Sequence, residues 1–200
     1  MFIKVCGLRT ADTVDAAVGA GVDAVGFVFA PGSVREITAG AAAALVARVP
    51  TGVETVGVFR KQPIDEVLRL ARAAGIGTVQ LHGDEPDEDF VRAADAGFAT
   101  IRAVSAARYT ATRGTAGDGR PQRLLIDATR PGSGEPFDPA DLPAPPGTFW
   151  LLAGGLTPEN AAEAIAAFHP SGVDVSSGVE SARGVKDPER IRAFVRAART

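Results

Sequence analysis

Eight short runs rich in β-branched and other apolar residues recur along the 200-residue chain, about one every 25 residues. Most of the segments between them have the periodicity of an amphipathic helix and a recognisable start signal. Neighbouring parallel strands need a crossover of a dozen or more residues, so this alternation predicts a parallel sheet covered by helices. The predicted strands are Phe2–Cys6, Ala24–Phe29, Val53–Phe59, Gly77–Leu81, Ala99–Val104, Leu124–Asp127, Thr148–Ala153 and Gly172–Ser176.

Three of the predicted helices have clear boundaries. Pro63 opens a segment whose apolar residues fall on one face, and Gly75 is expected to end it. Thr157-Pro158 and Asp187-Pro188 are expected to serve as the N-cap and first residue of two later helices. The proline-rich segment after the sixth strand predicts a turn or two of helix at most, and residues 114–121 predict a loop.

Eight strand–helix units favour an α/β fold closed into a (β/α)8 TIM barrel, because open doubly wound sheets more often have five or six strands. Two hundred residues are few for such a barrel, so each unit must be short and the sixth helical segment reduced. No shift in composition marks a linker. We therefore expect one barrel domain over residues 1–200.

Charge and composition exclude several functional classes. The chain has 21 basic and 24 acidic residues, a balance that does not favour nucleic acid or anionic membranes as partners. No apolar run approaches the ~18 residues that span a bilayer, and MFIKVCGLRT lacks the features of a signal peptide. We expect a cytoplasmic protein without a nucleic-acid or membrane partner. The single cysteine and two histidines leave no dense metal-ligand cluster, so no metal is expected.

Side-chain alternation along the strands places several polar groups inside the barrel. In the first strand, Lys4 and Cys6 are expected to point inward. An isolated buried charge is unfavourable, and the first and last strands are neighbours in a closed barrel. The sequence therefore predicts an ion pair between Lys4 and Asp174 beneath the site, with the charged groups within about 6 Å. The other residues expected to point inward are Gln80, His82, Arg102, Asp127 and Ser176.

Chemistry in such barrels lies at the carboxyl ends of the strands. Two glycine-containing motifs occupy these ends after the seventh and eighth strands, namely Gly154-Gly155 and Ser176-Ser177-Gly178. Glycines let backbone amides approach an anion closely, so the pair predicts a phosphate site. The alternative is that both motifs are only turns.

Four further strand-end residues are candidates for chemistry or binding. Cys6 is either a small buried apolar residue or a general base, if neighbouring cations lower the pKa of its thiol. Asp127 ends an apolar strand as either a loop cap or a general acid. Arg35 is either a solvated arginine or a planar ligand for a carboxylate. His82 is either an acid–base group or, as the sequence favours, a histidine hydrogen-bonded at the barrel rim.

Together, these motifs resemble the phosphoribosylanthranilate isomerase family. The resemblance implies a (β/α)8 barrel that rearranges N-(5-phosphoribosyl)anthranilate to 1-(o-carboxyphenylamino)-1-deoxyribulose 5-phosphate in tryptophan biosynthesis. By matching motif it implies that Cys6 is the general base, Asp127 the general acid and Arg35 the ligand of the anthranilate carboxylate. The implied rearrangement requires no cofactor. The matching segments, in chain order, are KVCGLRT, GFVFAPGSVR, VGVF, VQLHGDE, LLIDA, LLAGGLTPEN and VDVSSGVES…GVKD.

Two departures and three alternatives accompany the resemblance. The loop after Asp127 is shorter than expected and carries Glu135 and Pro136 where a Lys-Thr pair is common. A bifunctional isomerase that also acts in histidine biosynthesis would have an aspartate at the position of Cys6. Indole-glycerol-phosphate synthase would need a lysine acid and an extra N-terminal segment, whereas this chain starts at its first strand. A metabolite-binding barrel without catalysis is the third alternative. Monomer and homodimer both remain open.

Overall fold

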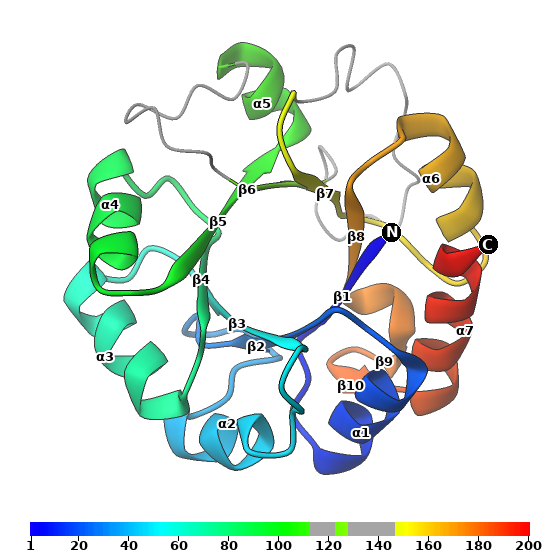
Figure 1. The fold of residues 1–200 in the computed structure, drawn as a ribbon, viewed down its shortest axis with the longest axis horizontal. Coiled ribbons are helices and arrows are strands. Elements are labelled where there is room, and N and C mark those ends of the chain that lie inside the picture. Colours follow the sequence, from blue (N-terminus) through cyan, green and yellow to red (C-terminus); the bar gives the residue numbers. More distant parts are fainter. Residues whose placement is uncertain (113–122, 128–146) are drawn as a thin grey trace.

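The computed structural model describes residues 1–112, 123–127 and 147–200. Eight parallel strands form a closed barrel in chain order, and helices surround it (Figure 1), which confirms the predicted (β/α)8 architecture. Each observed strand lies within two residues of its predicted bounds. The strands are β1 (Phe2–Cys6), β2 (Ala24–Val28), β3 (Glu54–Phe59), β4 (Thr78–Leu81), β5 (Ala99–Ser105), β6 (Arg123–Asp127), β7 (Trp150–Leu152) and β8 (Gly172–Val175).

Local signals set the ends of two helices as predicted. The α3 helix ends at Gly75, which has a φ of 69° and donates its amide to the last turn. The Asp187 carboxylate caps α7 by accepting hydrogen bonds from the amides of Glu189 and Arg190. The helices are α1 (Ala11–Ala20), α2 (Ala39–Val46), α3 (Ile64–Ala74), α4 (Asp87–Asp95), α5 (Ala106–Thr112), α6 (Ala161–Phe168) and α7 (Pro188–Arg199).

The α6 helix begins three residues later than the sequence predicts, because its N-cap is Asn160 and not Thr157. The Asn160 side chain accepts a hydrogen bond from the Thr157 amide at 2.7 Å and donates one to the Gly155 carbonyl at 3.0 Å. These bonds hold Thr157 and Pro158 in a turn before the helix. The same side chain therefore fixes the glycine loop that precedes it.

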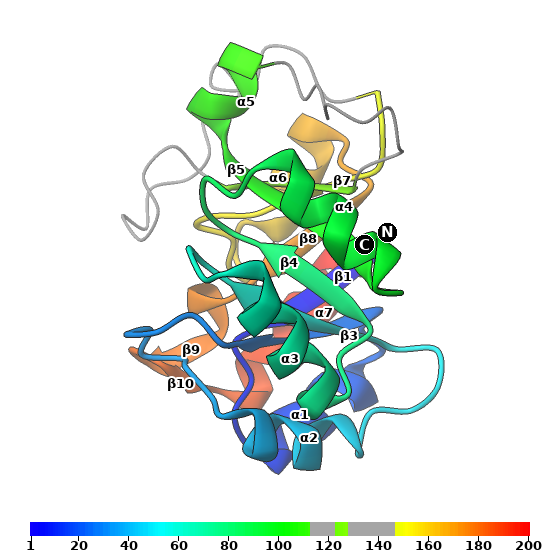
Figure 2. The same ribbon diagram turned by 90° about the vertical axis from the view of Figure 1, so that its left-hand side faces the viewer.

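A short hairpin follows β8, and the sequence did not predict it. It consists of a 3-10 turn, η2 (Ser177–Val179), and two antiparallel strands, β9 (Glu180–Ala182) and β10 (Val185–Lys186). Figure 2 shows the hairpin beside the loop that follows β2, at the carboxyl-terminal end of the barrel strands. The two segments are in close contact, because a Cβ at Gly184 would lie 3.1 Å from the carbonyl oxygen of Val34.

Apolar side chains fill both the barrel interior and the layer between strands and helices. One predicted orientation is wrong, because Arg102 points out of the barrel. Its guanidinium lies over the ring of Phe90 in α4, 3.7 Å from the centroid, and Ile101 and Ala103 point inward instead. The register of β5 thus follows its apolar residues. The apolar cluster that contains them comprises Ala24, Val56, Ile101, Ala103, Leu125, Leu151 and Ala153.

The predicted loop at residues 114–121, the predicted reduced segment after β6 and the departures at Glu135 and Pro136 lie outside the described residues. No helix in the described part of the chain is both long and apolar enough to cross a membrane.

Candidate active site

A buried ion pair forms the floor of the site, as the strand alternation predicts. Lys4 and Asp174 lie opposite each other in the parallel pairing of β1 with β8, and Lys4 Nζ is 2.8 Å from Asp174 Oδ1. The lysine side chain is fully buried. Burial acts to lower the pKa of Lys4, but the charges of Asp174 and Cys6 outweigh it and raise that pKa. Lys4 is therefore held in its charged form.

Cys6 lies one layer above this pair, at the end of β1, and is 6% exposed. Its sulfur occupies space left by a glycine, because a Cβ at Gly26 on β2 would lie 2.8 Å from it. Burial raises the pKa of the Cys6 thiol, while the positive charges of Lys4 and Lys186 act in the opposite direction. Asp174 adds to the upward shift. Burial therefore opposes ionisation of the thiol, while two neighbouring cations stabilise its thiolate.

Arg35, in the loop after β2, lies across the backbone next to Cys6. Its Nε and Nη2 atoms bind the two carboxylate oxygens of Glu180 at 2.6 and 2.9 Å. The arginine stem passes over Gly7, where a Cβ would come within 2.7 Å of Arg35 Cδ. Gly7 has a φ of +79°. A glycine here therefore satisfies both the backbone conformation and the path of the arginine.

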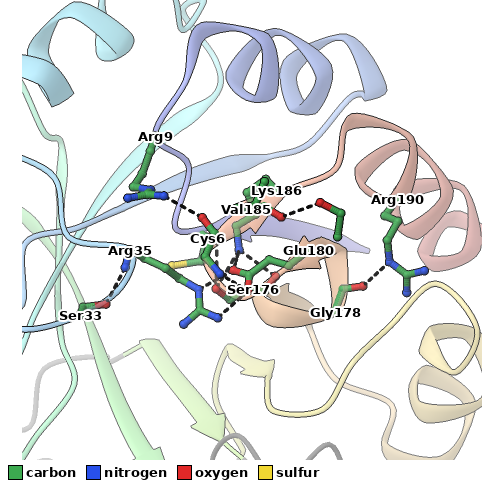
Figure 3. A network of polar contacts seen from close by, with 12 residues as sticks. Cys6, Arg9, Ser33, Arg35, Ser176, Gly178, Glu180, Val185, Lys186 and Arg190 are labelled. Carbon is green, nitrogen blue, oxygen red and sulfur yellow. Dashed lines mark hydrogen bonds and ion pairs between the residues drawn. The ribbon is translucent and has the colours of Figure 1, made fainter.

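Lys186 joins the hairpin to the end of β8. Its Nζ donates to Glu180 Oε1 and to the Ser176 carbonyl, each at 2.8 Å, and to Ser176 Oγ at 3.1 Å. Ser176 Oγ in turn donates to the Cys6 carbonyl at 3.2 Å. Burial lowers the pKa of Lys186. Figure 3 shows Cys6, Arg35, Ser176 and Glu180 gathered around these contacts.

The carboxylate of Glu180 accepts four hydrogen bonds in this network. Burial acts to raise its pKa, but the bonds from Arg35, Lys186 and the Gly184 amide lower the pKa of Glu180 to about 2. Glu180 is therefore an anion throughout the physiological range. Its charge offsets one of the two cations that bind it.

The two predicted phosphate motifs form adjoining loops. Gly154 and Gly155 have φ angles of +89° and +68°, which favour glycine. A Cβ at Gly178 would lie 1.8 Å from the Leu156 carbonyl oxygen, so η2 packs directly on the loop after β7. Within the described residues, neither the Gly154 nor the Gly155 amide has a protein hydrogen-bond partner. Ser177, the first residue of η2, is exposed.

Asp127 and His82 face each other on another part of the rim. Asp127 ends β6, and its Oδ2 lies 3.5 Å from Nε2 of His82, which follows β4. The Gln80 amide nitrogen lies 3.2 Å from His82 Nδ1. The buried Gln80 Oε1 has no hydrogen-bond partner in the described part of the chain. His82 is thus hydrogen-bonded at the barrel rim and also adjoins the candidate acid.

The structure brings the predicted residues together as neighbouring groups. Cys6, Arg35 and Ser176 share one set of contacts, Asp127 pairs with His82, and the glycine loops adjoin. Sequence reasoning missed Glu180 and Lys186, although both lie in the motif after the eighth strand. Among the described residues, no group of three or more His, Cys, Asp or Glu side chains is placed to hold a metal ion.

Comparison with known proteins gives one consistent family. Residues 3–197 match the family described as N-(5'phosphoribosyl)anthranilate (PRA) isomerase. The N-(5'-phosphoribosyl)anthranilate isomerase of Chromohalobacter salexigens is 45% identical over 204 residues, 96% of this chain and 92% of the relative. That of Deinococcus radiodurans is 42% identical over 209 residues, with 98% and 96% covered.

Solved structures agree with the sequence comparison. TrpF from Jonesia denitrificans superposes with a TM-score of 0.88 at 46% identity, covering 100% of this chain and 97% of that one. Phosphoribosyl anthranilate isomerase from Thermotoga maritima gives 0.87 at 34% identity, with 100% and 98% covered. A phosphoribosyl anthranilate isomerase in complex with reduced 1-(o-carboxyphenylamino)-1-deoxyribulose 5-phosphate gives 0.84 at 33% identity, again with 100% and 98% covered.

Proposed function

Because the chain belongs to the phosphoribosylanthranilate isomerase family, we propose that Cys6 is the general base and Asp127 the general acid of its reaction. The chain is an isomerase of tryptophan biosynthesis that rearranges N-(5-phosphoribosyl)anthranilate to 1-(o-carboxyphenylamino)-1-deoxyribulose 5-phosphate. The observation that carries the residue assignment is the position of Cys6. Its thiol lies at the end of β1 between the charges of Lys4 and Lys186.

Asp127 starts the reaction by protonating the ribose ring oxygen. The C1′–O bond then breaks, and the nitrogen lone pair forms a Schiff base with C1′. A carboxylic acid is suited to this step because it can donate a proton to an oxygen whose bond is breaking. His82, 3.5 Å from the carboxylate, holds Asp127 at the rim and contacts the substrate there.

Cys6, as a thiolate, then removes the proton from C2′ of the Schiff base. The electron pair moves to the nitrogen and gives an enolamine, which tautomerises to the ketone. Lys4 and Lys186 support this step because their charges favour the thiolate against the effect of burial.

Binding groups hold the reacting carbons between this acid and base. The backbone amides of Gly154-Gly155 and Ser176-Ser177-Gly178 bind the phosphate, and the Gly154 and Gly155 amides have no protein hydrogen-bond partner among the described residues. Ser176 supports the same loop and anchors it to Cys6 through its hydroxyl. Arg35 binds the anthranilate carboxylate. Binding energy from both ends of the substrate thus positions the carbon that reacts.

The setting of this activity forms part of the same proposal. Residues 1–200 act as one barrel domain in the cytoplasm, on a small phosphorylated substrate and without a metal, a cofactor or nucleic acid. The protein works as a monomer or a homodimer. The bound product analogue of the solved relative supports the substrate class.

Complementation of a tryptophan auxotroph that lacks this isomerase tests the proposal. Wild type is expected to restore growth, and Cys6→Ser and Asp127→Asn are expected to fail while accumulating as folded protein. Asp15→Asn is the matched control, because Asp15 forms an exposed ion pair with Arg48 on the outside of the barrel. Growth with both site variants at the wild-type rate would refute the assignment of acid and base.

A further inference from the structure

Glu180 is the residue that fixes the guanidinium of Arg35. We propose that Glu180, itself held by Lys186 and the Gly184 amide, is a positioning residue that orients Arg35 toward the carboxylate of the substrate. This inference rests on the proposed role of Arg35. It gives the hairpin after β8 a function in substrate recognition.

Every acceptor position of the Glu180 carboxylate faces a donor. Oε1 accepts from Arg35 Nε at 2.6 Å and from Lys186 Nζ at 2.8 Å. Oε2 accepts from Arg35 Nη2 and from the Gly184 amide, each at 2.9 Å. An amide in place of this carboxylate would direct its NH2 group at one of these donors. Only a carboxylate satisfies all four bonds.

Glu180 fixes Arg35 without using the whole guanidinium. The Glu180 side chain is 5% exposed and that of Arg35 is 23% exposed, so the acid lies beneath the arginine. The bidentate contact uses Nε and one hydrogen of Nη2, and Nη1 has no hydrogen-bond partner among the described residues. A guanidinium has five N–H donors in a rigid plane, so its outer edge retains a pair of donors for a second carboxylate.

The charge of the cluster suits an anionic ligand. Arg35 and Lys186 carry two positive charges against the single negative charge of Glu180, whose pKa of about 2 keeps it ionised. One net positive charge therefore remains at the barrel mouth beside Cys6 (Figure 3). Without Glu180, two like charges would repel each other and Arg35 would lose its fixed orientation. Binding would then include the cost of ordering a long side chain.

Steady-state kinetics of Glu180→Gln and Glu180→Asp test the inference. We expect KM for N-(5-phosphoribosyl)anthranilate to rise about tenfold in each variant, because a tenfold change corresponds to the upper range of the cost of ordering one long side chain. The value of kcat should stay within about threefold of wild type. The decisive comparison uses the phosphoribosyl adduct of aniline, which lacks the carboxylate. KM for this analogue should be unchanged, whereas a general loss of structure would raise both.

A double variant with Arg35→Met identifies the path of the effect. If Glu180 acts through Arg35, adding Glu180→Gln to Arg35→Met should raise KM no further. Glu66→Gln is the matched control, because Glu66 makes a bidentate contact with Arg69 on the exposed face of α3. The fluorescence of Trp150, the single tryptophan, reports folding of each variant.

The outcomes separate this inference from the proposed function. If Arg35→Met raises KM for the anthranilate substrate and both Glu180 variants do not, the positioning role is wrong. Equal rises with the aniline adduct would also overturn it. If Arg35→Met itself leaves KM unchanged, the proposed carboxylate site fails, and the positioning role fails with it.

Discussion

Breaking the buried Lys4–Asp174 ion pair from one side should destabilise the barrel far more than removing the pair. Lys4 Nζ and Asp174 Oδ1 are 2.8 Å apart, with the lysine side chain fully buried and that of the aspartate 9% exposed. At an effective dielectric constant of about 20, two unit charges at this distance attract by about 6 kcal/mol. Burying each ion removes hydration worth several kcal/mol, so the intact pair is close to balanced.

Lys4→Met leaves a buried carboxylate without its partner, and Asp174→Asn leaves a buried ammonium facing a neutral amide. Each should lower the free energy of unfolding by about 3–5 kcal/mol. The double variant removes both charges and should be less destabilised than either single variant. The coupling between the two substitutions should therefore exceed about 3 kcal/mol, because the two single losses add to more than the double variant loses.

Urea denaturation measures these values through Trp150, whose side chain is buried in the apolar layer outside the barrel strands. A cycle on the exposed Glu66–Arg69 pair is the control, with an expected coupling below about 1 kcal/mol. If the Lys4–Asp174 coupling is no larger than the surface value, the claim that each single variant leaves an uncompensated buried charge is refuted.

Three further predictions concern the site. Gly26→Ala places a Cβ 2.8 Å from the Cys6 sulfur, so it should lower the free energy of unfolding by about 1–3 kcal/mol and also lower kcat. A stable and fully active variant would contradict the close packing of Cys6 against Gly26. The alkylation rate of Cys6 should titrate with an apparent pKa above the ordinary thiol value, and this pKa should be higher still in Lys4→Met. Inorganic phosphate should slow the alkylation, and an unchanged rate would contradict the placement of Cys6 and the phosphate site at one barrel mouth. The lowered pKa of Glu180 stabilises the folded state above its ordinary pKa of 4.5, and this contribution is lost as pH falls toward 2. In denaturation measured between pH 5 and 2, the stability of Glu180→Gln should therefore fall less steeply than that of wild type. The same fall in both proteins would contradict this prediction.

Much of this architecture follows from sequence periodicity. Strand spacing predicted the barrel, and closure of the barrel made β1 and β8 neighbours, so that the Lys4–Asp174 contact could be predicted although 170 residues separate them. Arg102 shows the limit of the same reasoning. Alternation gives two possible faces, and in β5 the apolar Ile101 and Ala103 take the inward one, while the arginine stacks on Phe90 from a helix.

The positions of Glu180 and Lys186 could not be predicted in this way. They lie in a short hairpin whose register depends on Gly184 and on contact with the loop after β2. The Arg35–Glu180 contact spans 145 residues and joins two loops, for which strand alternation gives no register. A glutamate and a lysine flanking a glycine turn after the last strand were the available signal. Their chemistry appears only once the Arg35 loop is placed beside them.

The turnover of Cys6→Ser and Asp127→Asn tests the central claim most directly. General acid or base groups contribute about 10²- to 10⁴-fold to rate, so each variant should lower kcat at least 100-fold, with Asp15→Asn at the wild-type value. Folding, followed by Trp150 fluorescence, should persist in both variants, and phosphate should still protect Cys6 from alkylation in Asp127→Asn. A kcat within tenfold of wild type in either variant would contradict the assignment of that residue to proton transfer.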